Sequence, residues 1–145
     1  KQIVGVFNEK WMMPFAEALK ENSVENAFIV HSEDGMDEIS PFAKTKIIEL
    51  KDKKIKKFII DPNEFDVISD NKENLKGKNA EYNAKKIIDI FKGELNEFSH
   101  AVALNAAAGL IVSGKENNFK NAFKTSVQHL NSGDVYKHLL KIQII

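Results

Sequence analysis

The stretch IVGVFNEKWMMPFAEALKENSVENAFIV, residues 3–30, decides the fold class of this 145-residue chain. Its two ends, 3–7 and 26–30, are apolar runs with β-branched residues, a pattern that is typical of strands buried in a sheet. Between them, after the potential cap Asn8, apolar residues recur at helical spacing: Trp11, Met12, Phe15, Ala16 and Leu19. A strand, a helix and a second strand within 30 residues form a βαβ unit, so we predict a parallel strand pair and an α/β fold.

The rest of the chain adds a hairpin and several helices. Residues 45–50 (TKIIEL) and 55–60 (IKKFII) flank the polar segment KDKK, which predicts an antiparallel hairpin and therefore a mixed sheet. An irregular connection is expected over 61–78. The segments predicted after it are a helix over 80–93 capped by Asn79, a buried helix over 99–114, a helix that starts near Asn118, and a short closing segment, 135–145.

The composition is that of a soluble globular protein. The chain has 43% hydrophobic and 29% charged residues, a formal net charge of zero and no cysteine. The zero net charge gives no overall basic field that would indicate nucleic acid, and no apolar run approaches the length of a membrane span. The absence of cysteine excludes thiolate metal sites and disulfides. We therefore predict a single α/β domain over residues 1–145, in a cytoplasmic protein with no nucleic-acid or membrane partner.

Four carboxylates follow the second predicted strand, in the segment HSEDGMDEIS, residues 31–40: Glu33, Asp34, Asp37 and Glu38. In open α/β sheets, ligand sites lie at the carboxyl ends of strands. Carboxylates suit Mg²⁺, which takes one or two of them and completes its shell with water and substrate phosphates. The adjacent pair Asp37 and Glu38 is therefore a candidate metal site. A solvated loop is the alternative interpretation, because most acidic pairs in loops have no ligand.

Two further polar residues have both a structural and a functional interpretation. His31 ends the second predicted strand, and we interpret it as a hydrogen-bonded structural residue rather than a base or metal ligand. Asn105 lies inside the apolar segment LNAAAGL and needs a partner, which favours a buried amide that ties neighbouring backbone over a ligand contact. The sequence has no P-loop, dinucleotide-binding fingerprint or nucleophile elbow, so no catalytic or cofactor-binding side chain is predicted.

Three segments together resemble the anthranilate phosphoribosyltransferase family. Residues 2–41 are similar to the stretch that runs from a core strand into the family pattern V-x-H-G-x-D-G-L-D-E-I-S. Residues 77–94 resemble its G-G-D-x-x-x-N-A helix, and residues 102–115 resemble its L-N-A-A-x-x-L-x-x-x-G-K segment. The resemblance implies part of a phosphoribosyltransferase/nucleoside-phosphorylase-like α/β domain. It also implies transfer of the phosphoribosyl group of phosphoribosyl pyrophosphate (PRPP) to anthranilate in tryptophan biosynthesis, with release of pyrophosphate.

The resemblance assigns a role to the acidic pair. Asp37 and Glu38 fall on the family's metal-binding carboxylates, which hold Mg²⁺ at the diphosphate of PRPP. The chain departs from the family at Ser32, where the family has glycine, and at Lys78 and Asn79, where it has Gly-Asp.

Some of the family's characteristic parts have no counterpart in this sequence. They are an N-terminal helical domain with most of the dimer contacts, a Gly-rich loop around the pyrophosphate, and a Lys-His-Gly-Asn segment. Residues 1–145 are therefore expected to be a C-terminal fragment of a larger homodimeric enzyme and to be inactive alone.

Two other functions remain compatible with the sequence. The first is a related glycosyltransferase or phosphorylase that shares the α/β domain and uses another acceptor. The second is a non-catalytic, stand-alone α/β module in which the acidic pair is a solvated loop. In that case Asp37→Ala would change neither stability nor the response to any ligand.

Overall fold

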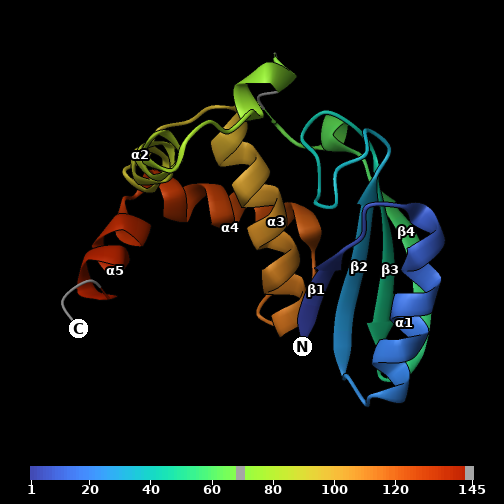
Figure 1. Cartoon of the computed structure of the whole chain (residues 1–145). Helices are drawn as coiled ribbons and strands as arrows, with labels where there is room; N and C mark the ends of the chain where they lie inside the picture. The colour runs from blue at the N-terminus through green and yellow to red at the C-terminus, as the bar shows by residue number, and fades with distance from the viewer. Residues whose placement is uncertain (68–70, 143–145) are drawn as a thin grey trace.

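The predicted βαβ unit is present in the structure, a computed structural model that describes residues 1–67 and 71–142 (Figure 1). Its elements are β1 (Gln2–Gly5), the 3-10 helix η1 (Glu9–Trp11), α1 (Met12–Glu21) and β2 (Asn26–Ser32). The strands β1 and β2 are parallel, as predicted. Asn8 caps the short helix η1, which leads directly into α1. The predicted cap therefore starts the helical segment, although its first turn is 3-10.

The predicted hairpin completes a mixed four-stranded sheet. β3 (Thr45–Lys51) and β4 (Lys54–Ile60) are antiparallel, and the strand order is β1-β2-β3-β4. The two-residue turn between them places Asp52 and Lys53 at φ angles of 49° and 62°. Positive φ at both positions characterises the turn whose twist matches that of a hairpin.

The helices follow the hairpin, and the two short 3-10 helices and the last helix were not predicted. They are η2 (Pro62–Glu64), η3 (Lys72–Leu75), α2 (Ala80–Phe91), α3 (Glu97–Ser113), α4 (Phe119–Asn131) and α5 (Asp134–Ile142). The helices α2, α3 and α4 confirm the prediction. The connection 61–78 holds two 3-10 turns, and its residues 68–70 lie outside the described residues. The closing segment 135–145 contains α5, which packs on α2 and α4, while residues 143–145 lie outside the described residues.

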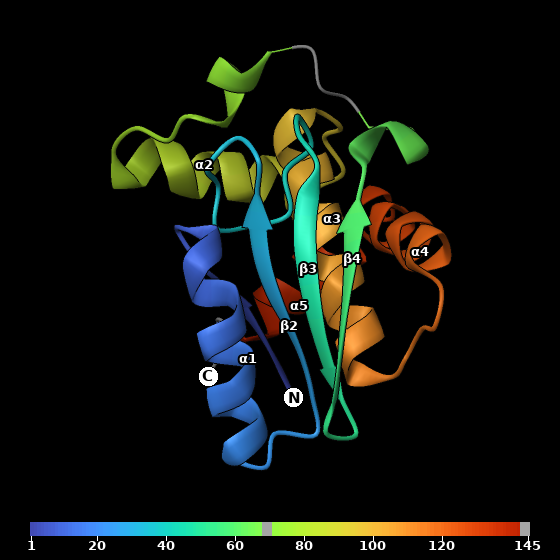
Figure 2. The same ribbon diagram turned by 90° about the vertical axis from the view of Figure 1, so that its right-hand side faces the viewer.

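Helices cover both faces of the central strands of the sheet, whereas β4 is largely exposed. α1 lies on one face and α3 on the other, with α2, α4 and α5 beyond α3 (Figures 1 and 2). Successive residues of β2 point to opposite faces, so Phe28 and Val30 belong to the cluster with α3, while Ala27 and Ile29 belong to the cluster with α1. Burial on both faces explains why this strand is a continuous apolar run.

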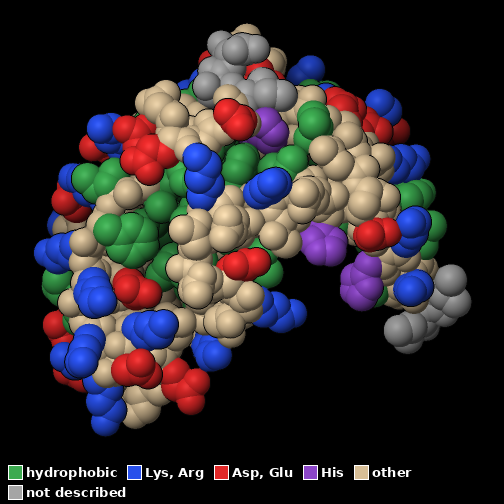
Figure 3. Space-filling view, turned by 180° about the vertical axis from the view of Figure 1, so that it is seen from behind, with side chains coloured by type: hydrophobic (Ala, Val, Ile, Leu, Met, Phe, Trp, Pro, Cys, Tyr) green, Lys and Arg blue, Asp and Glu red, His purple; other side chains and the backbone are tan. Residues whose placement is uncertain are grey.

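The surface carries both signs of charge and several exposed apolar side chains. Phe7 is 74% exposed and Ile59 is 53% exposed. Viewed from behind, basic and acidic side chains are interspersed, and the surface is hollowed between the sheet and α5 (Figure 3). Among the described helices, none combines the length and the hydropathy that crossing a membrane requires.

Candidate functional site

The acidic segment forms a loop, residues 33–44, between the carboxyl end of β2 and the start of β3. Because β1 runs parallel to β2, the carboxyl ends of both strands lie at this edge of the sheet. The loop is the cyan trace above the sheet and beside α3 in Figure 1. The carboxylates predicted from the sequence therefore lie where α/β sheets commonly bind ligands.

Asp34 is the carboxylate that holds this loop together. Its Oδ1 accepts a hydrogen bond from the Met36 backbone N–H (3.3 Å), and its Oδ2 accepts one from the buried Ser40 hydroxyl (2.8 Å). Lys72 Nζ lies 3.2 Å from Oδ2 and connects the loop to η3. Burial acts to raise the pKa of Asp34, but hydrogen bonds from Ser32, Ser40 and Lys72 outweigh it and lower that pKa. Asp34 is therefore ionised, and its carboxylate stabilises the loop through these contacts.

Asp37 and Glu38 are different from Asp34. Both are exposed, and within the described part of the chain neither carboxylate has a hydrogen bond or an ion pair to another residue. Their oxygens are exposed to solvent, from which they can bind a cation. Glu33, the fourth carboxylate, is also exposed but lies before the turn, and its backbone N–H donates to the Lys44 carbonyl oxygen (2.9 Å).

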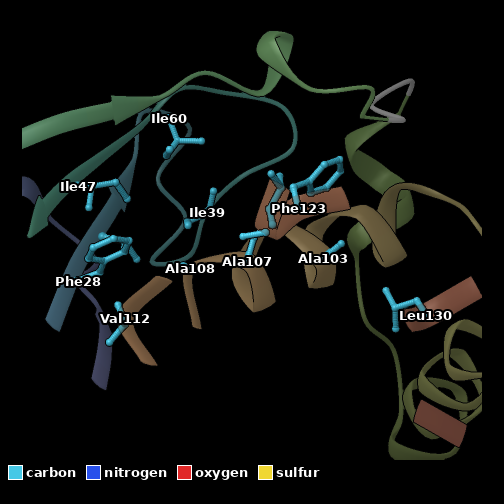
Figure 4. Close-up of a cluster of buried hydrophobic side chains, with 13 residues drawn as sticks. Phe28, Ile39, Ile47, Ile60, Ala103, Ala107, Ala108, Val112, Phe123 and Leu130 are labelled. Atoms are coloured by element: carbon cyan, nitrogen blue, oxygen red, sulfur yellow. The ribbon is translucent and has the colours of Figure 1, made fainter. Parts of the chain in front are cut away.

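Residues on each side of the pair fix its backbone. The ideal Cβ position on Gly5 overlaps the carbonyl oxygen of Asp37, so β1 and the loop are in direct contact. On the other side, the Ile39 N–H donates to Asn105 Oδ1 (3.0 Å), and Asn105 Nδ2 donates to the Ile39 carbonyl oxygen (3.0 Å). The side chain of Ile39 is fully buried beside Ala107 and Ala108 of α3 (Figure 4).

The structural interpretation of His31 and Asn105 is supported. His31 Nδ1 lies 2.8 Å from the Val6 carbonyl oxygen, so Nδ1 carries the proton and links β2 to the residue after β1. Asn105 ties backbone, as expected, and also donates to the Ala101 carbonyl oxygen (2.9 Å). Its partner is the acidic loop, however, which places this amide at the candidate site.

The donor set suits Mg²⁺ shared with a phosphorylated substrate. No group of three or more His, Cys, Asp or Glu side chains in residues 1–67 and 71–142 could enclose a metal. Mg²⁺ needs no such cage, since it commonly uses one or two carboxylates with water and substrate phosphates. Beside the pair lies a largely apolar hollow of about 620 Å³, with Met36, Glu38 and Asn105 among its lining residues. The two exposed carboxylates therefore fit the ion in type and accessibility.

Comparison with known proteins assigns the chain to a family. The profile described as "Glycosyl transferase family, a/b domain" matches residues 1–136. This chain belongs to that family. Since the match extends from β1 into α5, it includes every strand, the acidic loop and the helices that cover the sheet.

Proteins named anthranilate phosphoribosyltransferase are similar over nearly the whole chain. Anthranilate phosphoribosyltransferase of Pelagibacter ubique is 49% identical over 143 residues, which are 99% of this chain and 43% of that protein. The enzyme of the same name from Caldanaerobacter subterraneus is 39% identical over 97% of this chain and 42% of its own length. The chain thus spans about two-fifths of the length of these relatives.

Solved structures of proteins named anthranilate phosphoribosyltransferase have the same fold. The crystal structure of anthranilate phosphoribosyltransferase from Thermus thermophilus superposes with a TM-score of 0.84 at 31% identity, over 94% of this chain and 40% of that chain. The Saccharomyces cerevisiae enzyme in complex with PRPP and Mg superposes with a TM-score of 0.83 at 21% identity, which shows the shared fold. The expected α/β domain with a mixed sheet is therefore confirmed.

Sequence reasoning did not identify every residue that shapes the site. It gave no role to Gly5 or Lys72 and grouped Asp34 with the other carboxylates. For Asp34 a signal was available, because Ser40 lies in the same short segment and can hydrogen-bond to it. Gly5 and Lys72 have no such local signal, since each meets the loop from a distant part of the chain.

Proposed function

We propose that this chain supplies the metal-binding part of an anthranilate phosphoribosyltransferase. The observation that carries the proposal is the pair Asp37 and Glu38, exposed side by side at the carboxyl edge of the parallel strands. Membership of the glycosyl transferase family and 49% identity to a named anthranilate phosphoribosyltransferase support the same activity. The substrates would be PRPP and anthranilate.

Asp37 and Glu38 would hold Mg²⁺ through their carboxylate oxygens, with water and the diphosphate of PRPP as its other ligands. When bound, the ion offsets the negative charge that develops on the departing pyrophosphate. The other two carboxylates of the segment would not bind the metal in this proposal. Asp34 is committed to Ser40 and Lys72, and Glu33 lies on the other side of the turn.

The reaction requires no covalent intermediate on the protein. The amine nitrogen of anthranilate forms a bond to the anomeric carbon of the ribose, while the bond from that carbon to the pyrophosphate oxygen breaks. The bonding electron pair leaves with pyrophosphate, and the new secondary amine releases a proton. The task of the protein is to position two substrates and to stabilise separating charge. This chain contributes by presenting two carboxylates on a fixed loop.

We expect the other parts of the site in the portion of the enzyme beyond the matched region. The chain covers 43% of the Pelagibacter enzyme. The motifs expected to bind PRPP and anthranilate have no counterpart in residues 1–145. The same portion is expected to carry the homodimer contacts. In this proposal the complete enzyme acts in the cytoplasm in tryptophan biosynthesis, and residues 1–145 alone are inactive.

The test uses the full-length polypeptide that the gene encodes and the 145-residue chain, each with anthranilate, PRPP and Mg²⁺. Loss of anthranilate fluorescence reports turnover. We expect Mg²⁺-dependent turnover from the full-length polypeptide and none from the 145-residue chain. The double substitution Asp37→Asn and Glu38→Gln should lower kcat/KM by about 100-fold or more, since metal stabilisation of transition-state charge is worth several kcal/mol.

Glu33→Gln is the matched control, because it removes an exposed carboxylate from the same loop. It should leave turnover within about twofold of the original value. PRPP binding that needs Mg²⁺ and the acidic pair, without consumption of anthranilate, would point to a related enzyme with another acceptor. If the double substitution changed neither PRPP binding nor turnover, the acidic pair would be a solvated loop and the proposal would be wrong.

A further inference from the structure

We propose that Gly5 and Asn105 are positioning residues that set the geometry of the acidic pair. This inference rests on the proposed metal role of Asp37 and Glu38. Neither residue would touch the metal or the substrates through its own side chain. Gly5 acts by leaving room for the backbone of Asp37, and Asn105 acts by holding the backbone of Ile39.

The contact at Gly5 fixes the amino-terminal side of the pair. Gly5 is the last residue of β1 and lies opposite Val30 of β2, so its position is set by the sheet. A side chain at this position would overlap the Asp37 carbonyl oxygen and push the loop away from the strand. Gly5 is exposed to solvent, so this contact, and not burial, is what excludes a side chain.

Asn105 fixes the carboxyl-terminal side of the pair. Its amide makes two hydrogen bonds of 3.0 Å to Ile39, one with the N–H and one with the carbonyl oxygen. This arrangement imitates the pairing of an adjacent strand and leaves the Ile39 peptide groups little freedom. The helix α3 carries Asn105 and is itself anchored in the core by Leu104 and Ala108, which are fully buried. The helix α3 is therefore a rigid support that holds the loop in place at Ile39.

These two contacts bracket the acidic pair and act together. One meets the backbone at Asp37, and the other meets it one residue beyond Glu38. Mg²⁺ demands nearly ideal octahedral geometry, so carboxylates on a mobile loop bind it poorly. Fixing the backbone beforehand removes the cost of ordering the loop when the ion binds. Residues that orient metal ligands in this way typically change metal affinity by about 10- to 100-fold when they are replaced.

A purely structural role for Asn105 is the competing explanation. A polar residue in an apolar helix needs partners, and the Ala101 carbonyl oxygen already accepts one hydrogen bond from Nδ2. The two remaining bonds both go to the residue that follows the acidic pair, 66 positions away in sequence. The two explanations differ in what Asn105→Ala does to metal binding, as opposed to stability.

The experiment measures Mn²⁺ binding to the full-length polypeptide by electron paramagnetic resonance, with PRPP present. We expect Asn105→Ala and Gly5→Ala each to raise the Mn²⁺ concentration for half-saturation by about tenfold or more. Saturating Mn²⁺ should restore most of the turnover. Hydrogen exchange of the Ile39 amide should become faster in Asn105→Ala. Alanine favours the helical conformation at position 105, so this variant tests the proposal even if Gly5→Ala fails to fold.

Two variants that remove no contact with the loop serve as matched controls. Asn26→Ala removes a buried amide whose Nδ2 donates to the Val112 carbonyl oxygen (2.8 Å). Gly109→Ala adds a methyl group to α3 where, apart from the adjacent residues and the backbone of the helix itself, no described atom lies within 4 Å of the new Cβ position. Asn26→Ala should lower the melting temperature, and both controls should leave half-saturation within about twofold of the original value.

Two outcomes would overturn the inference, and the second of them would also overturn the proposed metal site. If Asn105→Ala and Gly5→Ala bind Mn²⁺ like the controls, while Asp37→Asn with Glu38→Gln abolishes binding, the positioning role alone is wrong. If the double substitution itself binds Mn²⁺ normally, both the proposed metal site and the positioning role are wrong.

Discussion

Asp34→Asn tests whether the loop depends on one ionised carboxylate. The substitution keeps the shape of the side chain but replaces an anionic acceptor with a neutral amide. The buried Ser40 hydroxyl then loses a charge-assisted hydrogen bond, which contributes about 1.5–3 kcal/mol, and the amide recovers part of it. The ion pair with the half-exposed Lys72 adds less than about 1 kcal/mol. We expect the free energy of unfolding to fall by about 2 kcal/mol.

The effect should depend on pH in a defined direction. Because the folded-state pKa of Asp34 is lowered, the unfolded chain takes up the proton more readily than the folded chain. The stabilisation from the ionised carboxylate is therefore complete at pH 7, above its ordinary pKa of about 3.9, and is lost as the pH falls through the lowered folded-state pKa. The difference between the original protein and Asp34→Asn should shrink accordingly.

Urea denaturation followed by far-UV circular dichroism measures this difference, at pH 7 and at a series of lower pH values. At pH 7 the melting temperature should also fall by about 4–8 °C for a domain of this size. Glu33→Gln is the control in the same loop and should change stability by less than about 0.5 kcal/mol. If Asp34→Asn and Glu33→Gln were equally stable at pH 7, the hydrogen bonds and ion pair of Asp34 would not stabilise the loop. An undiminished difference at pH 3 would refute the role of the charge.

Three further changes test the packing around the site. Leu104→Ala should destabilise the protein by about 3–4 kcal/mol in urea denaturation, because Leu104 is fully buried. Leu95→Ala is the control at a residue 44% exposed and should cost less than about 1 kcal/mol. Equal losses of stability in the two variants would contradict the assignment of Leu104 to the core. Asn96→Ala breaks the reciprocal cap with Ser99 at the start of α3 and should cost about 1–2 kcal/mol by the same assay, and no change would exclude the cap as a stabilising feature. Lys72→Met should lower the melting temperature by at most about 4 °C, and a larger loss would mean that the exposed ion pair carries more of the loop's stability than its geometry supports.

Much of the fold could be predicted from local patterns. Apolar runs and helical spacing predicted the parallel pair β1 and β2, the hairpin β3–β4, and the helices α2, α3 and α4. The helix α5 was not predicted, because its nine residues are too few to be distinguished by periodicity alone and it is stabilised by packing on α2 and α4. The acidic pair was found because motif order and strand position are properties of the sequence itself.

What the sequence by itself determined was the type of each segment, the position of the carboxylates after a buried strand, and the family. Only the tertiary structure decided which carboxylates are committed and which are free. The Asp34 carboxylate is satisfied by Ser40 nearby in the sequence and by Lys72, which is 38 residues away. The pair is bracketed by Gly5 and by Asn105, which lies 66 residues from its partner Ile39. Hydrogen-bond satisfaction and close backbone contact depend on groups that only folding brings together, whereas strand and helix periodicity is written along neighbouring residues.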